Sequence, residues 1–373
     1  MRVLVLNAGS SSLKVSLVDE DDKVLADREF PLTEGRIDQS QLATAVHSME
    51  GVEAIGHRIV HGGPRYRRSV RIDAEVIRYL VTITDLAPLH LPASLAGIAA
   101  ARELLPRAPA VACLDTAFHS RMPEAASTYA VPEEWRVRYG VRRYGFHGFS
   151  HAYASRRAAE MLGRPPSELR VVTCHLGAGA SLAAVRAGRS VDTTMGFTPL
   201  EGLVMATRSG TVDPGMLLWL QRHAGIDEPA LTEALDREGG LKALAGTSDM
   251  REILQRIADG DDGAELAFDV YIHRLRALIA AMAAAMNGFD ALVFTGGVGE
   301  NSAPVRAAAA GGLRFLGVEI DPTLNGDLSA DSDISASGAQ VATLVIKARE
   351  DVEVAREVRR VLTAPPPQPD SGR

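Results

Sequence analysis

Apolar residues along the first third of the chain follow two spacings, one typical of strands and one typical of helices. Short apolar runs such as Val3-Leu4-Val5-Leu6 are bounded by turn residues, which is typical of buried strands. Longer stretches repeat apolar residues every three or four positions, which indicates helices packed on one face. The pattern predicts strands at 2–7, 12–19, 23–30, 52–60 and 109–115, and helices at 40–49, 73–84 and 93–105.

The rest of the chain shows the same alternation with longer helices. Strands that alternate with helices favour an α/β architecture. The pattern predicts strands at 170–177, from Ala291 onward and at 341–346, and helices from about 149, near 213–224, 228–238 and 263–287, and at 351–362.

Two segments that lie far apart resemble each other. The first, VLVLNAGSSSLKV, begins at Val3, and the second, VVTCHLGAGASLAAV, begins at Val171. Each contains an apolar strand, a polar residue, a glycine-rich connection, Ser-Leu and a second strand, and a single gap aligns them. Their separation is close to half of the 373 residues, so we interpret the similarity as an internal duplication that produces two similar domains.

Composition argues against several classes of protein. The net charge of −7 leaves no basic excess to neutralise phosphates, so a general nucleic-acid binder is not expected. The longest apolar stretch, Leu275–Met286, is too short to span a bilayer, and Met1-Arg2 runs directly into a strand pattern. We therefore expect a soluble cytoplasmic protein without nucleic-acid or membrane partners. Cys113 and Cys174 lie in apolar runs and are expected to be small buried hydrophobes.

Three glycine-rich segments follow apolar strands, namely NAGSSSLK at 7–14, HLGAGAS at 175–181 and FTGGVGEN at 294–301. Small residues let backbone N–H groups and hydroxyls approach a phosphate, so we interpret all three as phosphate-binding loops. A solvated serine-rich turn is the alternative for the first. The P-loop pattern and a G-x-G-x-x-G between strand and helix are absent from the sequence. We therefore expect a cleft between paired domains, in which hairpin loops grip the phosphates.

Charged residues and histidines stand at or after predicted strands. Arg58 and Asp115 each lie near the end of a strand, and His147 and Arg208 lie in glycine-flanked segments. Positive charge at such a site suits phosphoryl transfer, because negative charge spreads over three equatorial oxygens in the transition state. Two alternatives remain open: Arg58 as an ordinary surface or ion-pairing residue, and a zinc site at His147 and His151, which lacks the H-E-x-x-H glutamate.

Seven motifs follow one another along the chain: VLVLNAGSSSLK, GHRIVHGG, DTAFH, YGFHGFSH, CHLGAGAS, TRSGTVDPG and FTGGVGEN. Together, over residues 2–362, they resemble the acetate kinase family of the acetate and sugar kinase, Hsp70 and actin superfamily. The resemblance implies a duplicated actin-like (ribonuclease H-like) α/β fold with an interdomain nucleotide cleft. It also implies a homodimer and reversible transfer of phosphate from ATP to acetate, giving acetyl phosphate and ADP. Mg²⁺, with Mn²⁺ as an alternative, would accompany the nucleotide.

The resemblance further implies domain boundaries. The first actin-like domain would comprise residues 1–117 and 351–363, and the second, nucleotide-binding domain residues 118–350. Residues 364–373 are rich in proline and are expected to form a disordered tail.

Roles for individual positions also come from the resemblance. Asp115 would be the catalytic acid/base residue, and His147 and Arg208 would stabilise the transition state. Arg58 would hold the acetate carboxylate, and Asn7 and Glu350 would be the Mg²⁺ ligands. The methyl pocket would be lined by Val60, Leu89, Phe146 and Pro199, and the transferred phosphate approached by Ser10, Ser12 and Lys14. ATP would be bound by the phosphate loop His175, Leu176, Gly177, Ala178 and Gly179, and by the adenosine segments Asp249, Met250, Arg251, Gly297, Val298, Gly299, Glu300 and Asn301.

Four positions refine these expectations. Acetate is already a carboxylate at neutral pH, so a positioning role for Asp115 fits the chemistry better than general base catalysis. Val60 lies two residues after Arg58 on the same predicted strand and is expected on the same face. The resemblance implies acetate as substrate, because family members that favour propionate tend to have a smaller residue at this position. Ala178 stands where the family has asparagine, and Arg349 precedes the metal ligand Glu350, so both changes bear on nucleotide and metal affinity.

Two competing functions remain. The same family also suggests a kinase that prefers propionate or butyrate. An actin-like or Hsp70-like ATPase would need the nucleotide loops but not two arginines beside an apolar pocket, and it would bring a peptide-binding or filament-forming extension.

Overall fold

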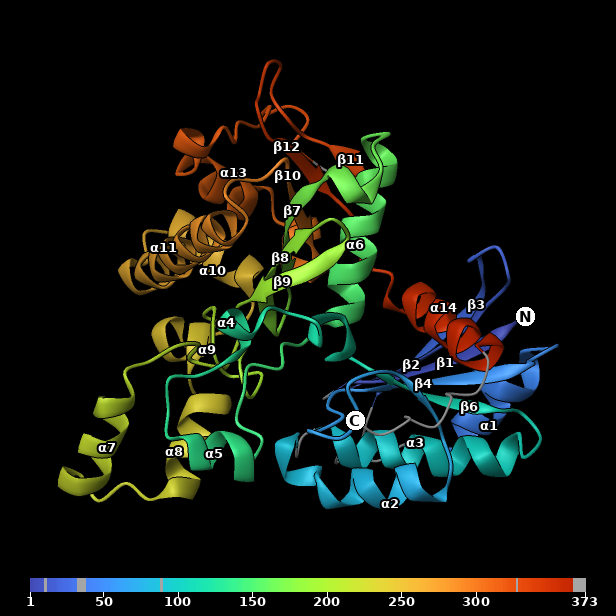
Figure 1. Cartoon of the computed structure of the whole chain (residues 1–373). Coiled ribbons are helices and arrows are strands. Elements are labelled where there is room, and N and C mark those ends of the chain that lie inside the picture. Colours follow the sequence, from blue (N-terminus) through green and yellow to red (C-terminus); the bar gives the residue numbers. More distant parts are fainter. Residues whose placement is uncertain (10–11, 32–37, 88–89, 327, 365–373) are drawn as a thin grey trace. The chain divides into compact units, whose positions relative to one another are not determined.

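The structure, a computed structural model, describes residues 1–9, 12–31, 38–87, 90–326 and 328–364. The chain divides into two compact units (Figure 1). Unit 1 comprises Met1–Ala117 and Arg349–Arg373, and unit 2 comprises Phe118–Ala348. Glu350, expected at the end of the second domain, therefore lies in unit 1. Leu89 and Ser10 and the tail from 365 onward lie outside the described residues.

Unit 1 contains a six-stranded mixed sheet in the order β3-β2-β1-β4-β6-β5. The strands β1, β4 and β6 are parallel neighbours, and the hairpin β1–β2–β3 continues the sheet as antiparallel strands. The bounds are Val3–Ala8 (β1), Ser12–Val18 (β2), Val24–Pro31 (β3), Ala54–Ile59 (β4), Val70–Arg71 (β5) and Ala110–Leu114 (β6).

Helices cover both faces of this sheet. Leu4, Leu6 and Ile55 pack with α1 and α3 in one apolar cluster. The neighbouring Gly56 faces the other side, because a Cβ placed on it would lie 2.7 Å from Val354 Cγ1 in α14. Asp38 and Asp73 begin α1 and α2 by accepting hydrogen bonds from the first-turn N–H groups. The bounds are Gln39–Ser48 (α1), Ala74–Thr82 (α2), Leu91–Leu104 (α3) and Glu350–Thr363 (α14).

Unit 2 contains a second six-stranded sheet, in the order β9-β8-β7-β10-β12-β11. The strands β7, β10 and β12 are parallel, whereas β8, β9 and β11 pair antiparallel with their neighbours. The bounds are Arg170–Leu176 (β7), Ala180–Arg186 (β8), Arg189–Thr193 (β9), Ala291–Thr295 (β10), Ser332–Asp333 (β11) and Ala342–Val345 (β12).

Two helices of unit 2 pack directly on this sheet. Ala154 and Ala158 of α6 pack on Val171, Ala183 and Val293, and α11 packs against β7, β8 and β9. The helices of unit 2 are α4 (Glu124–Ser127), α5 (Glu133–Arg138), α6 (Gly148–Met161), α7 (Pro214–His223), α8 (Glu228–Asp236), α9 (Gly240–Ala245), α10 (Met250–Ala258), α11 (Asp262–Ala285), α12 (Gly296–Asn301) and α13 (Ala303–Gly311). Single 3₁₀ turns occur in the two units at Thr84–Leu86, Ala117–His119, Pro166–Glu168 and Arg314–Leu316.

The two sheets share one topology. Each begins with a three-stranded antiparallel meander, adds two parallel strands beside the first strand, and ends in a short antiparallel edge strand. The repeated sequence segments form the equivalent hairpins β1–β2 and β7–β8. The internal duplication predicted from the sequence is therefore present in the fold.

Three predictions from the sequence need correction. The segment FTGGVGEN is not a loop after its strand, because residues 296–301 form helix α12. Gly296 adopts φ +79° and lies against the Leu176 carbonyl, so only glycine turns the chain this sharply from β10 into the helix. Helices α9, α10 and α13 were not predicted. Val60 lies after the end of β4 at Ile59, so strand alternation does not place it on the face of Arg58.

Other predictions agree with the structure. Cys113 and Cys174 are buried free thiols, and burial raises the pKa of both. Among residues whose placement the structure describes, every helix is too short or too polar to cross a membrane.

Candidate active site

In unit 1, the predicted site residues lie at the carboxyl ends of three neighbouring parallel strands. Asn7 lies near the end of β1, Arg58 is the penultimate residue of β4, and Asp115 directly follows β6. Because β1, β4 and β6 are adjacent in the sheet, these side chains meet at one edge. The sequence separates them widely, and the sheet brings them together.

Arg58 is the centre of this group. Its Nη2 donates to Asp115 Oδ2 at 2.8 Å and its Nε to Asp115 Oδ1 at 3.4 Å, so the two side chains form a two-pronged ion pair. Arg58 Nη1 also donates to Asn7 Oδ1 at 3.1 Å. Asp115 is only 1% exposed and Arg58 11% exposed, so the pair is largely shielded from water. The geometry supports a positioning role for Asp115, which orients the guanidinium.

Glu350, the first residue of α14, completes the group. Asn7 Nδ2 donates to Glu350 Oε2 at 2.9 Å, and Arg58 Nε lies 3.7 Å from the same oxygen. Burial opposes the charge on Arg58, but the carboxylates of Asp115 and Glu350 outweigh it and raise the pKa of the guanidinium. Arg58 therefore stays a cation at every relevant pH.

The donors at Asn7 and Glu350 suit a hard divalent cation. Carboxylate and amide oxygens are ligands that Mg²⁺ accepts, and Mg²⁺ takes few protein ligands when phosphates and water supply the others. Within the described ranges no three His, Cys, Asp or Glu side chains gather as a metal cluster. The two residues therefore fit a metal that is shared with a phosphate.

Two of the predicted phosphate donors of the first hairpin, Ser12 and Lys14, lie on one face of β2. Ser12 Oγ donates to Glu29 Oε1 at 2.7 Å, and Lys14 Nζ lies 3.8 Å from Glu29 Oε2. Lys14 pairs across the strands with Asn7, so its side chain is on the same side of the sheet as the Arg58 group. Lys14 is well exposed and its salt bridge is weak.

In unit 2, the predicted phosphate loop is the tight turn of the hairpin β7–β8. Leu176 pairs with Ala180, and the Gly177 N–H donates to the Gly179 carbonyl at 3.0 Å. The Ala178 carbonyl accepts from the Ala206 N–H at 3.2 Å, which ties the turn to the loop that carries Arg208. Replacement of asparagine by Ala178 removes a side-chain donor but leaves this backbone arrangement available.

Arg208 and His147 converge beside this turn. A Cβ placed on Gly179 would lie 3.3 Å from His147 Nε2 and 3.4 Å from Arg208 Nη1. The missing side chain of Gly179 therefore leaves space toward which two polar groups point. Arg208 Nη1 also donates to the Pro199 carbonyl at 3.3 Å, and its Nε lies 4.0 Å from Asp236. Burial lowers the pKa of Arg208, and Asp236 partly offsets this effect.

His147 is held in an unusual conformation at the start of α6. Its φ of 55° and ψ of 30° are left-handed, which is uncommon for a residue other than glycine and is found at functional sites. His147 Nδ1 lies 2.9 Å from Ser181 Oγ, and its ring lies over that of His175, with centroids 4.3 Å apart. His175 Nδ1 is in turn 2.7 Å from Ser150 Oγ.

The comparisons with known proteins agree with this geometry. A family model described as the acetokinase family matches residues 36–356. The chain belongs to the acetokinase family.

Relatives and solved structures resemble it along almost their whole length. An acetate kinase from Synechococcus sp. is 47% identical over 405 aligned residues, covering 97% of this chain and 99% of the relative. The acetate kinase of Porphyromonas gingivalis superposes with a TM-score of 0.87 at 36% identity, covering 97% of this chain and 100% of the other. A propionate kinase from Francisella tularensis superposes with a TM-score of 0.88 at 35% identity, covering 96% and 99%. The predicted duplicated actin-like α/β fold is confirmed.

The adenosine segments suggested by the family resemblance differ in how exposed they are. Asp249 begins α10 and accepts from Arg251 at 2.6 Å, and this partnership lowers the pKa of Asp249 to about 2. Arg251 is 91% exposed, whereas Met250 is buried. Arg251 is therefore available to a ligand, and Met250 packs in the interior.

Helix α12 is held by its own side chains. Glu300 Oε1 accepts from the N–H groups of Gly296 at 2.8 Å and Ala348 at 2.9 Å, and Asn301 Nδ2 donates to the Gly297 carbonyl at 2.8 Å. Glu300 and Asn301 thus support the helix, Val298 is half-buried and Gly299 is buried. Gly297 is exposed, and a Cβ there would meet no atom within 4 Å.

The structure describes three of the four residues that the family resemblance assigns to a methyl pocket, each within its own unit. Val60 is buried in unit 1, and Phe146 is buried in unit 2, where its carbonyl lies 3.0 Å from His119 Nε2. Pro199 is half-buried, and its carbonyl accepts from Arg208.

Sequence reasoning missed Ser181 as a site residue. Ser181 lies on β8 and contacts both His147 and His151, at 2.9 and 2.7 Å. His151, which entered the sequence analysis as a zinc-ligand alternative, contacts Thr173 and Ser181 through its two ring nitrogens. The i, i+4 spacing of His147 and His151 carried a signal, but it indicates a shared hydroxyl and not a shared metal.

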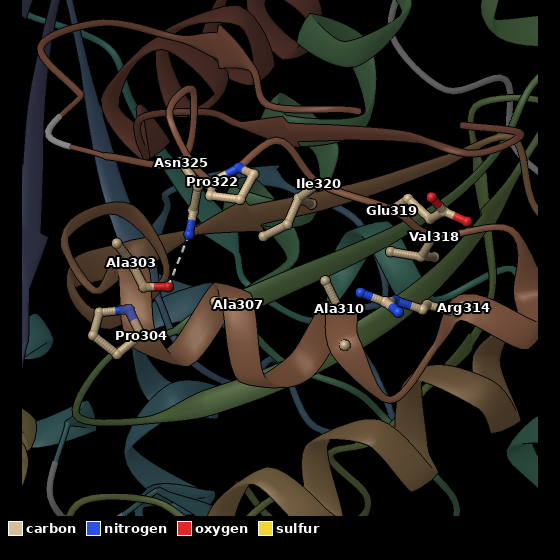
Figure 2. A pocket seen from close by; sticks show the side chains of 11 residues that line it. Ala303, Pro304, Ala307, Ala310, Arg314, Val318, Glu319, Ile320, Pro322 and Asn325 are labelled. Carbon is tan, nitrogen blue, oxygen red and sulfur yellow. Dashed lines mark hydrogen bonds between the residues drawn. The ribbon is translucent and has the colours of Figure 1, made fainter. Parts of the chain in front are cut away.

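A pocket of about 440 Å³ lies elsewhere in unit 2, between α13 and residues 318–325 (Figure 2). Asn325 lies at one end of it, where its Nδ2 donates to the Ala303 carbonyl at 3.0 Å, and Arg314 and Glu319 lie at the other. None of the site residues predicted from the sequence lines this pocket.

Proposed function

We propose that this protein is an acetate kinase, which transfers the γ-phosphoryl group of ATP to acetate and gives acetyl phosphate and ADP. Membership of the acetokinase family and the similarity to acetate kinases of several organisms support the proposal. The observation that carries it is the presence of two largely buried guanidiniums, Arg58 near the end of β4 and Arg208 beside Gly179.

The chemistry can be assigned to the residues of each unit. An acetate oxygen attacks the γ-phosphorus in line, and the bond from that phosphorus to the β–γ bridging oxygen breaks, so no covalent enzyme intermediate is needed. Arg58, oriented by Asp115, would hold the acetate carboxylate. Arg208 and His147 would stabilise the charge on the equatorial oxygens, and the N–H groups of Ala178 and Gly179 would donate to ATP phosphates, since the Gly177 N–H is already bonded to the Gly179 carbonyl.

A divalent cation belongs to this proposal. Mg²⁺, or Mn²⁺ in its place, would be held by Asn7 and Glu350, and when bound it neutralises phosphate charge. Arg349 does not compete for Glu350, because its Nε lies 3.6 Å from Asp351 Oδ1. Replacement of Glu350 by Ala is expected to raise the Mg²⁺ concentration for half-maximal rate several-fold, because one of few protein ligands is lost. A Mg²⁺ titration of both proteins measures this, and an unchanged midpoint would remove Glu350 from the metal site.

We also propose a homodimer and a cytoplasmic location, where ATP and ADP are available. Large apolar side chains are exposed on α5, directly after it and on α7 of unit 2, which is unusual for a surface that stays in water: Trp135, Val137, Tyr139, Met216, Leu218 and Trp219. Light scattering coupled to size-exclusion chromatography tests the dimer. A monomer at micromolar concentration would contradict it.

The substrate assay decides the function. Purified protein with Mg-ATP is offered acetate, propionate, butyrate or no acid, and the acyl phosphate is trapped with hydroxylamine. An acetate kinase gives acetohydroxamate with the highest kcat/KM for acetate. Preference for propionate would indicate the activity named for the Francisella relative, and ATP hydrolysis independent of any acid would indicate an actin-like or Hsp70-like ATPase.

A further inference from the structure

Unit 2 contains a continuous chain of buried hydrogen-bonding groups that ends at His147. Thr173 Oγ1 lies 2.7 Å from His151 Nδ1, His151 Nε2 lies 2.7 Å from Ser181 Oγ, and Ser181 Oγ lies 2.9 Å from His147 Nδ1. Thr173, His151 and Ser181 are completely buried. Each of these contacts is short enough for a normal hydrogen bond, so the position of one proton determines which atom donates in the next contact.

The Thr173 hydroxyl determines the direction of the chain. Its other neighbour is the Ala183 carbonyl at 3.4 Å, which is long for a bond between two oxygens. The proton of Thr173 is therefore best placed on the 2.7 Å contact, where it is donated to His151 Nδ1. Burial, together with His119 and His175, lowers the pKa of His151 well below its usual value, so His151 is neutral. A neutral imidazole that accepts at Nδ1 carries its proton on Nε2.

The same logic continues to His147. His151 Nε2–H donates to Ser181 Oγ, and the Ser181 hydroxyl donates its own proton to His147 Nδ1. A neutral His147 that accepts at Nδ1 carries its proton on Nε2. This nitrogen lies beside the space at Gly179, toward which Arg208 also points.

We propose that Ser181, supported by His151 and Thr173, holds neutral His147 in the tautomer that donates a hydrogen bond from Nε2. The inference rests on the proposed function, in which His147 stabilises the transferred phosphoryl group. If His147 gains a second proton, both of its ring nitrogens donate, Nδ1 to Ser181 Oγ, so Nε2 remains a donor in both states. Ser181 and His151 are thus positioning residues that keep Nε2 of His147 a hydrogen-bond donor while the imidazole is neutral.

The groups around His147 favour a neutral hydrogen-bond donor over a charged one at this position. Arg208 supplies a positive charge from the loop after β9, His175 of β7 lies against the ring, and His151 of α6 shares Ser181. His119 lies one ring further, with its centroid 5.7 Å from that of His151, and burial lowers its pKa to about 4. A second cation beside Arg208 would be repelled.

The direct test reads the protonated nitrogen by NMR of the full chain labelled with ¹⁵N-histidine, with His147→Gln used to assign the His147 signals. At pH 8 the wild type is expected to show the Nε2–H tautomer, and Ser181→Ala to show a substantial Nδ1–H fraction. Ser190→Ala is the matched control, because it removes another buried serine–histidine contact, at 2.7 Å from His119 Nδ1, without touching His147. An Nδ1–H tautomer in the wild type overturns the proposal, whether or not the protein phosphorylates acetate.

The kinetic test separates positioning from general structural damage. Ser181→Ala is expected to lower kcat about tenfold at pH 8, since part of one transition-state donor is lost. The KM for ATP is expected to change little, and Ser190→Ala is expected to keep the wild-type kcat. Equal losses of kcat in the two variants would contradict the proposal. If Ser181→Ala does not fold, Thr173→Val has nearly the same shape, removes the first hydroxyl, and is held to the same two outcomes.

Discussion

The two sheets have the same strand order, yet the groups at their carboxyl edges are held in different ways. In unit 1, Arg58, Asp115 and Glu350 are ionised side chains that bind one another. In unit 2, the equivalent hairpin carries glycines, and histidines are held by hydroxyls such as Ser181. Duplication preserved the architecture and allowed the chemistry of the two edges to diverge.

This difference has energetic consequences. A buried ion pair ties stability to function, because removal of one partner leaves the other charge unsatisfied. A site built from glycine and neutral imidazoles leaves fewer charges uncompensated when one side chain is lost. We therefore expect substitutions at the edge in unit 1 to affect folding and turnover together, and those in unit 2 to affect mainly turnover.

Replacement of the two arginines tests this contrast with the largest expected effect. Arg58→Ala and Arg208→Ala should each lower kcat at least ~100-fold, because an arginine in this role contributes roughly 10³-fold. Arg58→Ala should also cost about 3–5 kcal/mol of unfolding free energy, because Asp115 is left buried and unpaired. Arg208→Ala should cost about 1 kcal/mol or less, since Asp236 is distant and partly exposed.

Assays at saturating ATP and acetate, with urea unfolding of each variant, measure both quantities. The double variant Arg58→Ala with Asp115→Asn is the control, and it should recover stability without recovering turnover. Equal losses of unfolding free energy in the two single variants would contradict the expected difference between the units.

Gly179→Ala tests whether catalysis depends on the open space beside Gly179 in unit 2. The new Cβ would meet His147 and Arg208 at 3.3–3.4 Å, so kcat should fall roughly 10- to 100-fold as these groups are displaced. Gly311→Ala is the matched control, because a Cβ there meets no atom within 4 Å. Turnover close to wild type in Gly179→Ala would show that the space is not used.

Val60→Ala tests whether unit 1 selects the alkyl group of the acid. One methylene in an apolar pocket is worth about 1–3 kcal/mol, so the ratio of kcat/KM for acetate over propionate should fall about tenfold. Val60 is buried next to the end of β4, which is consistent with this role or with core packing. A constant ratio in the variant would assign Val60 to the core.

His57→Leu tests a smaller effect, the pH dependence of stability. His57 is buried, its Nε2 has no hydrogen-bond partner among the described residues, and burial lowers its pKa to about 3. The unfolded chain takes up the proton near pH 6.5, so the stabilisation is complete above that pH and is lost progressively as the pH falls toward 3. From pH 7 to pH 5 the wild type should lose about 2 kcal/mol more than His57→Leu.

Urea unfolding at the two pH values measures this difference, and parallel losses would contradict it. His119→Leu offers the comparison in unit 2. It should remove a similar pH dependence but also lower stability at pH 7, because Ser190 loses its partner.

The sequence was sufficient to predict those parts of the site that depend on strand ends. Arg58 and Asp115 follow apolar runs, and parallel strands bring such residues to one edge, whereas Asn7 was assigned only through the family resemblance. Glu350 could be assigned only by family resemblance, because a carboxylate at the start of a charged helix is ordinarily a surface group. The pattern and the resemblance placed Ser181 in a phosphate-binding segment but did not predict its contacts with His147 and His151, since these depend on the pairing of β7 with β8 and on the position of α6.

The glycine-rich segments were the other place where interpretation of the sequence failed. The sequence GGVGEN was interpreted as a loop, yet Gly296 serves only to turn the chain and the following residues are helical. The sequence shows that the first hairpin has GSSS at 9–12 where the second has GAG at 177–179. It did not reveal that the missing Cβ of Gly179 leaves room for two converging side chains.

The position of α14 in the chain determines when each half of the protein can be completed on the ribosome. Unit 2 is one continuous segment, 118–348, whereas unit 1 needs its final helix, which packs under Gly56 and pairs Arg356 and Arg359 with Asp22. Asn7 therefore cannot meet Glu350 until the ribosome has passed α14. A nascent chain stopped before residue 349 would lack Glu350, so unit 1 and the metal ligands proposed above can be completed only after all of unit 2 has been synthesised.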